Sequence, residues 1–208
     1  MSGGLGRIPP DLVVRGFEIF ENFLDESKQK TLLQDIRKVV LAAPLFAPTT
    51  ARGKEMSVRM TSAGRLGWVS DSSGYRYEAT HPRGMAWPAI PESVLEIWRA
   101  VGPDDRDPDC CLINFYDASA RMGLHQDRDE ADFSWPVVSI SLGDDALFRI
   151  GNPTRGGKTD SIWLRSGDVV VMGGDARLAY HGVDRIKEGT SLLLPKGGRI
   201  NLTLRVVA

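Results

Sequence analysis

Histidine, cysteine and excess charge are all scarce in this 208-residue sequence. It contains 3 histidines and 2 cysteines, and the cysteines, Cys110 and Cys111, are adjacent. Because neighbouring residues of a strand point to opposite faces, this pair predicts two reduced core thiols and argues against a disulfide. With so few histidines a histidine-rich zinc site is excluded, so any metal site must use carboxylates or cysteines. The formal net charge of −1 excludes a wholly electrostatic nucleic-acid binder, although it leaves room for a local basic groove.

Long apolar runs are absent as well. The sequence has no stretch of 18 apolar residues, and its opening MSGGLGRIPP has no apolar segment, so we expect neither a membrane span nor a secretory signal. The cytoplasm is then the expected location. The composition, 42% hydrophobic with 22 glycines, is typical of globular proteins, and we expect one domain over residues 1–208.

Apolar periodicity predicts two helices near the N-terminus. The segment Leu12–Phe20 favours a strand, and Asp25 is the expected cap of a helix that ends at Pro44. A second helix is expected after Pro91 and ends at Gly102. The expected apolar stripes of the two helices consist of Leu32, Leu33, Ile36, Val39 and Val40, and of Val94, Leu95, Ile97, Trp98 and Val101.

The second half of the sequence is rich in short β runs. Residues 51–89 lack periodicity and predict short strands with long loops, whereas from Asp109 onward apolar runs alternate with Gly, Pro and Asp. Short strands at this spacing favour an antiparallel sandwich or jelly roll with helices packed outside it. The expected strands are CCLINFY, WPVVSISLG, ALFRI, DSIWLR, DVVVMGG, SLLLP and RINLTLRVV.

Two of these runs alternate polar and apolar residues, which places the polar side chains of each run on one face. Two guanidiniums on such a face could bind a dicarboxylate or a phosphate bidentately, whereas the alternative is an outer strand with a solvated side. The polar set of the last run is Arg199, Asn201, Thr203 and Arg205. The corresponding face of CCLINFY carries Leu112, Asn114 and Tyr116.

His125 and Asp127 are two residues apart, so in an extended chain their side chains point the same way. An isolated His-x-Asp pair is also compatible with a surface histidine near acids. With His181 further along the chain, however, the three residues form the two-histidine, one-carboxylate set of non-haem iron(II) oxygenases. The segment 151–159 superficially resembles a phosphate-binding loop, but its spacing is one residue too long and a strand follows, so we interpret it as a hairpin loop.

Taken together, these segments resemble the AlkB family of iron(II)- and 2-oxoglutarate-dependent dioxygenases. The resemblance implies an α+β, mainly β fold with a double-stranded β-helix (jelly-roll or cupin-like) core at about 109–208. It also implies flanking N-terminal helices and a nucleotide-recognition lid at about 45–90. The matching motifs are GWVSDSSGYRY at 67–77, NFY at 114–116, LHQDRDE at 124–130, PVVSISLG at 136–143, GDVVVMGGDARLAYHG at 167–182 and RINLTLR at 199–205.

The resemblance also implies the ligands of the metal and of the cosubstrate. Iron(II) would be held by His125, Asp127 and His181. Arg199, assisted by Tyr116 and Asn201, would hold the distal carboxylate of 2-oxoglutarate. Arg205 and Asn114 would hold the carboxylate end that chelates iron.

The resemblance assigns substrate contacts to five further residues. Trp68 and Tyr75, with Tyr77 nearby, would stack a flipped base against the second metal histidine, His181. Asp129 would accept the exocyclic amino group of the base, and Arg155 would reach the substrate.

The activity implied by the resemblance is oxidative dealkylation of 1-methyladenine and 3-methylcytosine in DNA, possibly RNA. It would consume oxygen and 2-oxoglutarate and release succinate, CO2 and formaldehyde. We expect a monomer that acts on single-stranded DNA, with contacts from a locally basic lid, although scattered arginines also suit a plain solvated loop. The alternatives are a dioxygenase of the same chemistry acting on protein or a small molecule, and a catalytically silent nucleic-acid-binding β-barrel.

Overall fold

The computed structural model describes residues 8–50, 52–103 and 105–208 of the chain. Residues 1–7 lie outside the described part of the chain. They belong to the opening segment in which we expected no secretory signal. Within that part no helix is long and apolar enough to cross a membrane. Cys110 and Cys111 are buried and free, as predicted, and burial raises the pKa of Cys110 to about 12.

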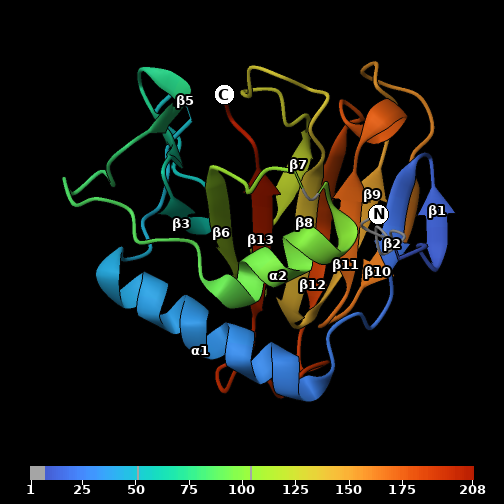
Figure 1. Ribbon diagram of the computed structural model, residues 1–208. Helices are drawn as coiled ribbons and strands as arrows, with labels where there is room; N and C mark the ends of the chain where they lie inside the picture. Colours follow the sequence, from blue (N-terminus) through green and yellow to red (C-terminus); the bar gives the residue numbers. More distant parts are fainter. Residues whose placement is uncertain (1–7, 51, 104) are drawn as a thin grey trace, which may run out of the picture.

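Two antiparallel sheets and a separate hairpin make up the β structure (Figure 1). This arrangement confirms the mainly β prediction of a double-stranded β-helix. In spatial order the large sheet consists of β1 (Leu12–Val14), β2 (Phe17–Phe20), β11 (Val169–Met172), β8 (Val137–Gly143), β13 (Arg199–Arg205), β6 (Cys110–Tyr116) and β3 (Arg59–Gly64). The smaller sheet consists of β10 (Asp160–Leu164), β9 (Asp145–Ile150), β12 (His181–Lys187) and β7 (Met122–His125).

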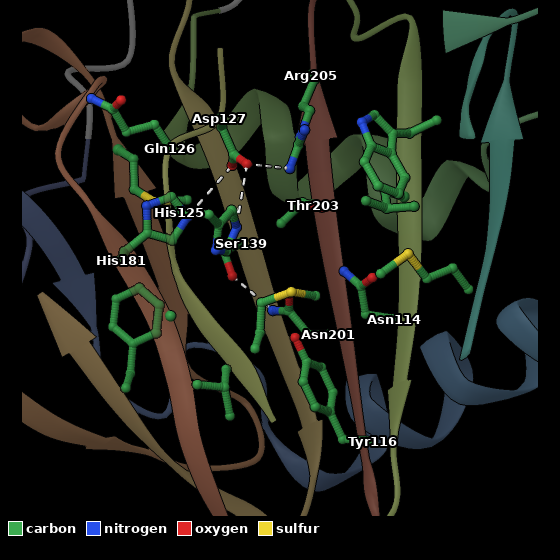
Figure 2. A pocket seen from close by; sticks show the side chains of 18 of the residues that line it. Asn114, Tyr116, His125, Gln126, Asp127, Ser139, His181, Asn201, Thr203 and Arg205 are labelled. Carbon is green, nitrogen blue, oxygen red and sulfur yellow. Dashed lines mark hydrogen bonds and ion pairs between the residues drawn. The ribbon is translucent and has the colours of Figure 1, made fainter. Parts of the chain in front are cut away.

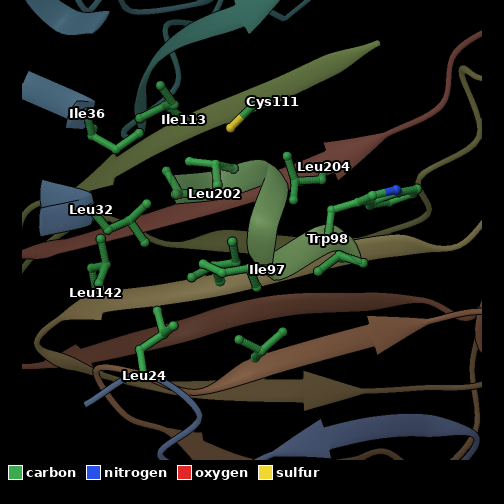
Figure 3. Packing of buried hydrophobic residues seen from close by; sticks show 14 of the residues in the cluster. Leu24, Leu32, Ile36, Ile97, Trp98, Cys111, Ile113, Leu142, Leu202 and Leu204 are labelled. Carbon is green, nitrogen blue, oxygen red and sulfur yellow. The ribbon is translucent and has the colours of Figure 1, made fainter. Parts of the chain in front are cut away.

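Both predicted helices form and pack on the outer face of the large sheet (Figure 3). The Asp25 side chain caps α1 (Glu26–Ala42) by accepting a hydrogen bond from the Lys28 N–H, and α2 (Glu92–Val101) begins after Pro91. Their stripes meet the apolar face of the sheet, so the polar faces of the same strands are left to point between the two sheets. The buried stripes are Leu32, Leu33, Ile36 and Val39 in α1, and Val94, Ile97, Trp98 and Val101 in α2.

Two predicted strands need correction, and two further strands were missed. Leu12–Phe20 is two strands, because Arg15 and Gly16 adopt φ angles of +48° and +81° and form a tight turn. The run SLLLP forms no strand, and its Leu192 is 97% exposed. Strands β7 and β12 were not expected from the sequence. In β12, charged residues and a bulge between Val183 and Arg185 interrupt the alternation of polar and apolar side chains.

The expected lid segment at about 45–90 divides between two parts of the fold. Strand β3 is an edge strand of the large sheet, paired with β6, whereas β4 (Gly67–Asp71) and β5 (Gly74–Glu78) form the separate hairpin. His81 is buried beside this hairpin, where its Nε2 lies 2.8 Å from the Pro44 carbonyl oxygen and its ring contacts Trp87. His81 is therefore a structural residue beside the β4–β5 hairpin.

Candidate functional site

A cavity of about 370 Å³ lies between the two sheets and beneath the β4–β5 hairpin (Figure 2). That volume suits a small-molecule site. Of the site residues implied by the resemblance, Tyr77 and Arg155 do not line it. Those that line it are Trp68, Tyr75, Asn114, Tyr116, His125, Asp127, Asp129, His181, Arg199, Asn201 and Arg205, together with Leu112 and Thr203 from the two alternating strands.

Antiparallel pairing of β7 with β12 brings the three candidate metal ligands together. His125 and His181 are directly opposite each other in the register, and Asp127 follows the end of β7 by two residues. The Nε2 atoms of His125 and His181 each lie 3.6 Å from a carboxylate oxygen of Asp127 (Figure 2). One potential ligand atom from each residue lies within 4.8 Å of the others.

The hydrogen bonds and charges of this cluster suit a divalent metal. Nδ1 of His125 and of His181 contacts a backbone carbonyl oxygen, at 2.9 and 3.0 Å, which directs the lone pair of each Nε2 toward Asp127. Oδ2 of Asp127 is buried and has no hydrogen-bond partner among the residues that the structure describes. Desolvation in the pocket and the neighbouring His181 lower the pKa of His125, which favours the neutral ring that binds metals.

Asp127 is an anion in this setting. Burial alone raises the pKa of its carboxyl, but the Arg205 guanidinium and the two imidazoles outweigh burial and hold that pKa well below its usual range. Nη2 of Arg205 lies 2.9 Å from Asp127 Oδ1. The donor set therefore fits iron(II): two imidazoles and one ionised carboxylate.

Strand β13 lies between β8 and β6 in the large sheet, so its polar face is buried inside the cavity, and the alternative of a solvated outer strand is wrong. The register places Arg199 opposite Tyr116 and Asn201 opposite Asn114. The shared face that alternation predicted for these two strands therefore exists, and it faces the metal cluster across the cavity.

Arg199 is a buried cation whose direct partners are all neutral. It is 1% exposed and donates to the carbonyl oxygens of Asp144 and Leu164, at 3.2 Å each, and to Ser141 Oγ at 2.6 Å. Burial lowers its pKa to about 10, so it stays charged at neutral pH. A buried cation without a carboxylate partner is costly, which favours an anionic ligand at this end of the cavity.

Several other buried polar atoms of the cavity also lack partners in the structure. Buried polar atoms normally have partners, so this concentration indicates a place for a polar ligand. A dicarboxylate the size of 2-oxoglutarate fits the donor set. The atoms are Asn114 Oδ1, Thr203 Oγ1, Arg199 Nε and Arg205 Nε.

The β4–β5 hairpin contributes an aromatic platform to the cavity. The rings of Trp68 and Tyr75 stack on each other, with centroids 5.4 Å apart and an interplanar angle of 24°. Trp68 is 8% exposed and donates from its indole N–H to Asp129 Oδ2 at 2.9 Å, whereas Tyr75 is 53% exposed. Asp129 therefore holds the platform in place with one of its carboxylate oxygens.

Two substrate residues implied by the resemblance lie outside the cavity, and two buried residues of the site motifs were missed. The Tyr77 hydroxyl points away from the cavity to Glu130 and Arg205, and Arg155 is exposed on the β9–β10 loop. Glu130 and Arg177 were given no role, yet both are buried and lie 2.9 Å apart beside Asp127. Their presence within LHQDRDE and GGDARLAYHG was the available signal, because buried ionisable residues inside a site motif need partners.

Comparison with known proteins agrees with this fold and site. Residues 16–205 match the 2OG-Fe(II) oxygenase superfamily. The chain is 53% identical over 197 residues to the alpha-ketoglutarate-dependent dioxygenase AlkB homolog of Caulobacter vibrioides, covering 94% of this chain and 90% of the relative. It is 41% identical over 179 residues to the alpha-ketoglutarate-dependent dioxygenase AlkB of Escherichia coli, covering 84% and 82%.

A solved structure agrees as well. The structure of OsALKBH1 matches with a TM-score of 0.82 and 32% identity, covering 95% of this chain and 100% of that one. Fold and site define an iron(II)- and 2-oxoglutarate-dependent dioxygenase that uses oxygen. The chain belongs to the AlkB family.

Proposed function

We propose that this enzyme removes N-alkyl groups from nucleobases in nucleic acid. The observation that carries the proposal is the aromatic platform of Trp68 and Tyr75 above the metal cluster, with the Asp129 carboxylate beside it. Aromatic side chains stack on any base, and a carboxylate favours a cationic alkylated base over its neutral parent. A dioxygenase acting on protein or an aliphatic small molecule has no use for such a platform.

Relatives with known names support a nucleic-acid substrate. The chain is 30% identical over 224 residues to the DNA N(6)-methyladenine demethylase ALKBH1C of Arabidopsis thaliana, of which it covers 48%. It is also 30% identical over 128 residues to the tRNA demethylase abh1 of Schizosaccharomyces pombe. We assign 1-methyladenine and 3-methylcytosine as substrates, because alkylation there blocks base pairing and lowers the cost of extruding the base.

The chemistry and the roles of the protein groups follow from the donor set. With 2-oxoglutarate and oxygen, iron(II) supplies hydroxylation of the N-alkyl carbon, and one oxygen atom enters succinate as CO2 leaves. The hydroxylated methyl group then departs as formaldehyde and the base is restored. His125, Asp127 and His181 would hold the metal, Arg199 and Arg205 would hold the carboxylates of the cosubstrate, and Asn114, Tyr116 and Asn201 would orient it.

The two metal-site imidazoles differ in the ring surface that a base can reach. The side chain of His125 is 39% exposed and that of His181 is 8% exposed. His181 is also covered by Phe17 and Phe148, whose ring centroids lie 6.1 and 5.8 Å away. We therefore propose that the base stacks between Trp68 and His125, in place of the His181 expected from the resemblance.

The backbone of the substrate needs cations near the cavity. In the lid, Arg76 is already paired with Asp71 and Glu78, and Arg65 is paired with Asp109. We propose that phosphates contact five other exposed cations, namely Arg52, Lys54, Arg83, the pocket residue Arg128 and Arg155. So few phosphate contacts favour single-stranded DNA as the substrate. We further propose that the enzyme acts as a monomer and that this activity takes place in the cytoplasm.

The direct test is an assay of the purified enzyme. With iron(II), 2-oxoglutarate and ascorbate, it should remove the methyl group of 3-methylcytosine from a single-stranded oligonucleotide, as measured by mass spectrometry, and form one succinate per methyl group lost. A panel with methylated RNA and duplex DNA separates the substrate classes. If succinate forms but no oligonucleotide loses its methyl group, the chain is a dioxygenase for another class of substrate.

Replacing Trp68 by alanine separates base binding from the chemistry. We expect Trp68→Ala to weaken dealkylation about 5- to 150-fold, since a stacked base contributes about 1–3 kcal/mol. The slow turnover of 2-oxoglutarate without nucleic acid should persist, because Trp68 contacts neither the metal cluster nor Arg199. Equal loss of both activities would show that Trp68 supports the cosubstrate site and not the base.

A further inference from the structure

Four buried charged groups form a cluster behind the metal site. Glu130 accepts from Arg177 Nη2 at 2.9 Å with one oxygen and from Arg205 Nη1 at 3.2 Å with the other. Arg205 also pairs with Asp127, and Arg177 Nη1 donates to the Asp127 backbone oxygen at 2.5 Å. Two arginines and two carboxylates thus balance their charges within the protein interior.

The lid joins this cluster through Tyr77 of strand β5. Its hydroxyl donates to Glu130 Oε1 at 2.5 Å and accepts from Arg205 Nη1 at 3.1 Å. Tyr77 is the cross-strand partner of Trp68, whose indole donates to Asp129. The two facing aromatics of the hairpin are therefore hydrogen-bonded to the consecutive carboxylates Asp129 and Glu130, which lie two and three residues after the metal ligand Asp127.

Glu130 stands where three parts of the site meet: the lid, the metal-ligand loop and the guanidinium on the cosubstrate side of the cavity. It does not line the cavity, so it contacts none of the reacting groups. Glu130 holds Arg205 in place, and these two residues supply both partners of the Tyr77 hydroxyl. Glu130 Oε1 accepts a hydrogen bond from the hydroxyl, and Arg205 Nη1 donates one to it. We propose that Glu130 is a positioning residue which, through Tyr77, couples the seating of the β4–β5 hairpin to the binding of 2-oxoglutarate beside Arg205.

Coupling of this kind is reciprocal. If the seated hairpin favours the orientation of Arg205 that binds a carboxylate, then the bound carboxylate stabilises the seated hairpin by the same free energy. The link between the hairpin and Arg205 consists of hydrogen bonds of ordinary strength. Losing such a bond should change the equilibrium between the seated and the unseated hairpin about 5-fold. The inference depends on the enzyme class and not on the proposed substrate, so its test needs no nucleic acid.

The test is hydrogen–deuterium exchange of the whole chain with Mn²⁺, measured with and without 2-oxoglutarate. In the wild type, 2-oxoglutarate should slow exchange of the backbone amides of residues 67–78 about 5-fold. In Tyr77→Phe, which removes one hydroxyl and no packing, this slowing should disappear. The thermal shift produced by 2-oxoglutarate should persist in the variant, which shows that the cosubstrate is bound.

Two further variants complete the test. Ser70→Ala removes another buried hydroxyl of the hairpin, one that donates to the Thr49 carbonyl oxygen and does not touch residues 127–130, so it should keep the slowing. Glu130→Gln should lose it, and if that variant does not fold, Tyr77→Phe decides. The proposal is overturned if 2-oxoglutarate binds without slowing exchange in the wild type, or if Tyr77→Phe shows the same slowing as the wild type.

Discussion

Asp127→Ala should reduce 2-oxoglutarate turnover by more than about 100-fold. Replacing a residue that only orients a metal ligand costs about 10- to 100-fold in metal affinity or activity. Asp127 is itself a ligand and the one anion of the cluster, so its loss should cost more. The variant should also lose the rise in Tm that Mn²⁺ gives the wild type. Succinate formation and thermal unfolding with and without metal measure the two effects.

Asp132→Ala is the matched control for this variant. Asp132 lies in the same loop, is exposed, and accepts a hydrogen bond from the Ser134 N–H outside the cavity. It should keep both turnover and the response to Mn²⁺. Should Asp127→Ala retain the thermal shift given by Mn²⁺, then the three-residue cluster is not the metal site.

Arg199→Met should raise the KM for 2-oxoglutarate about 100-fold or more. Methionine keeps much of the side-chain length but removes the charge and the donors, and hydrogen bonds to a charged group contribute about 1.5–3 kcal/mol each. Removing a buried cation that has only neutral partners should leave the ligand-free protein folded. The dependence of succinate formation on 2-oxoglutarate concentration measures the effect.

Two comparisons make the Arg199 result specific. Arg199→Lys retains the charge without the planar fork and should recover only part of the affinity. Arg149→Met changes a partly exposed arginine of β9 outside the cavity and should leave the KM unchanged. An unchanged KM in Arg199→Met would assign the anionic end of the cosubstrate to another part of the cavity.

The elements that sequence predicted best are those with strong local periodicity. The stripe around Leu32 and Ile36, the Asp25 cap and the alternation of β13 are properties of neighbouring residues, and each appears in the structure. Strands β7 and β12 have no such signal. They are strands because β12 pairs with β9 on one side and with β7 on the other, which is a long-range property.

The candidate site shows the same division. The pattern His-x-Asp, the distant His181 and the polar face of β13 pointed to metal and anion chemistry without any coordinates. The sequence did not indicate that Glu130 and Arg177 are buried partners, nor that Tyr77 points to them and away from the cavity. Those placements depend on how the hairpin lies against the loop after β7.

The sequence by itself determined which atoms are available: two imidazoles and a carboxylate for a metal, and alternating arginines for an anion. Local periodicity and residue chemistry are sufficient for that, because they require no knowledge of distant contacts. Only the tertiary structure decided that His125 and His181 face each other, that Arg199 is buried with neutral partners among the described residues, and that the β4–β5 hairpin is hydrogen-bonded to the loop after β7. Strand pairing and burial decide these points, since they depend on residues far apart in the chain.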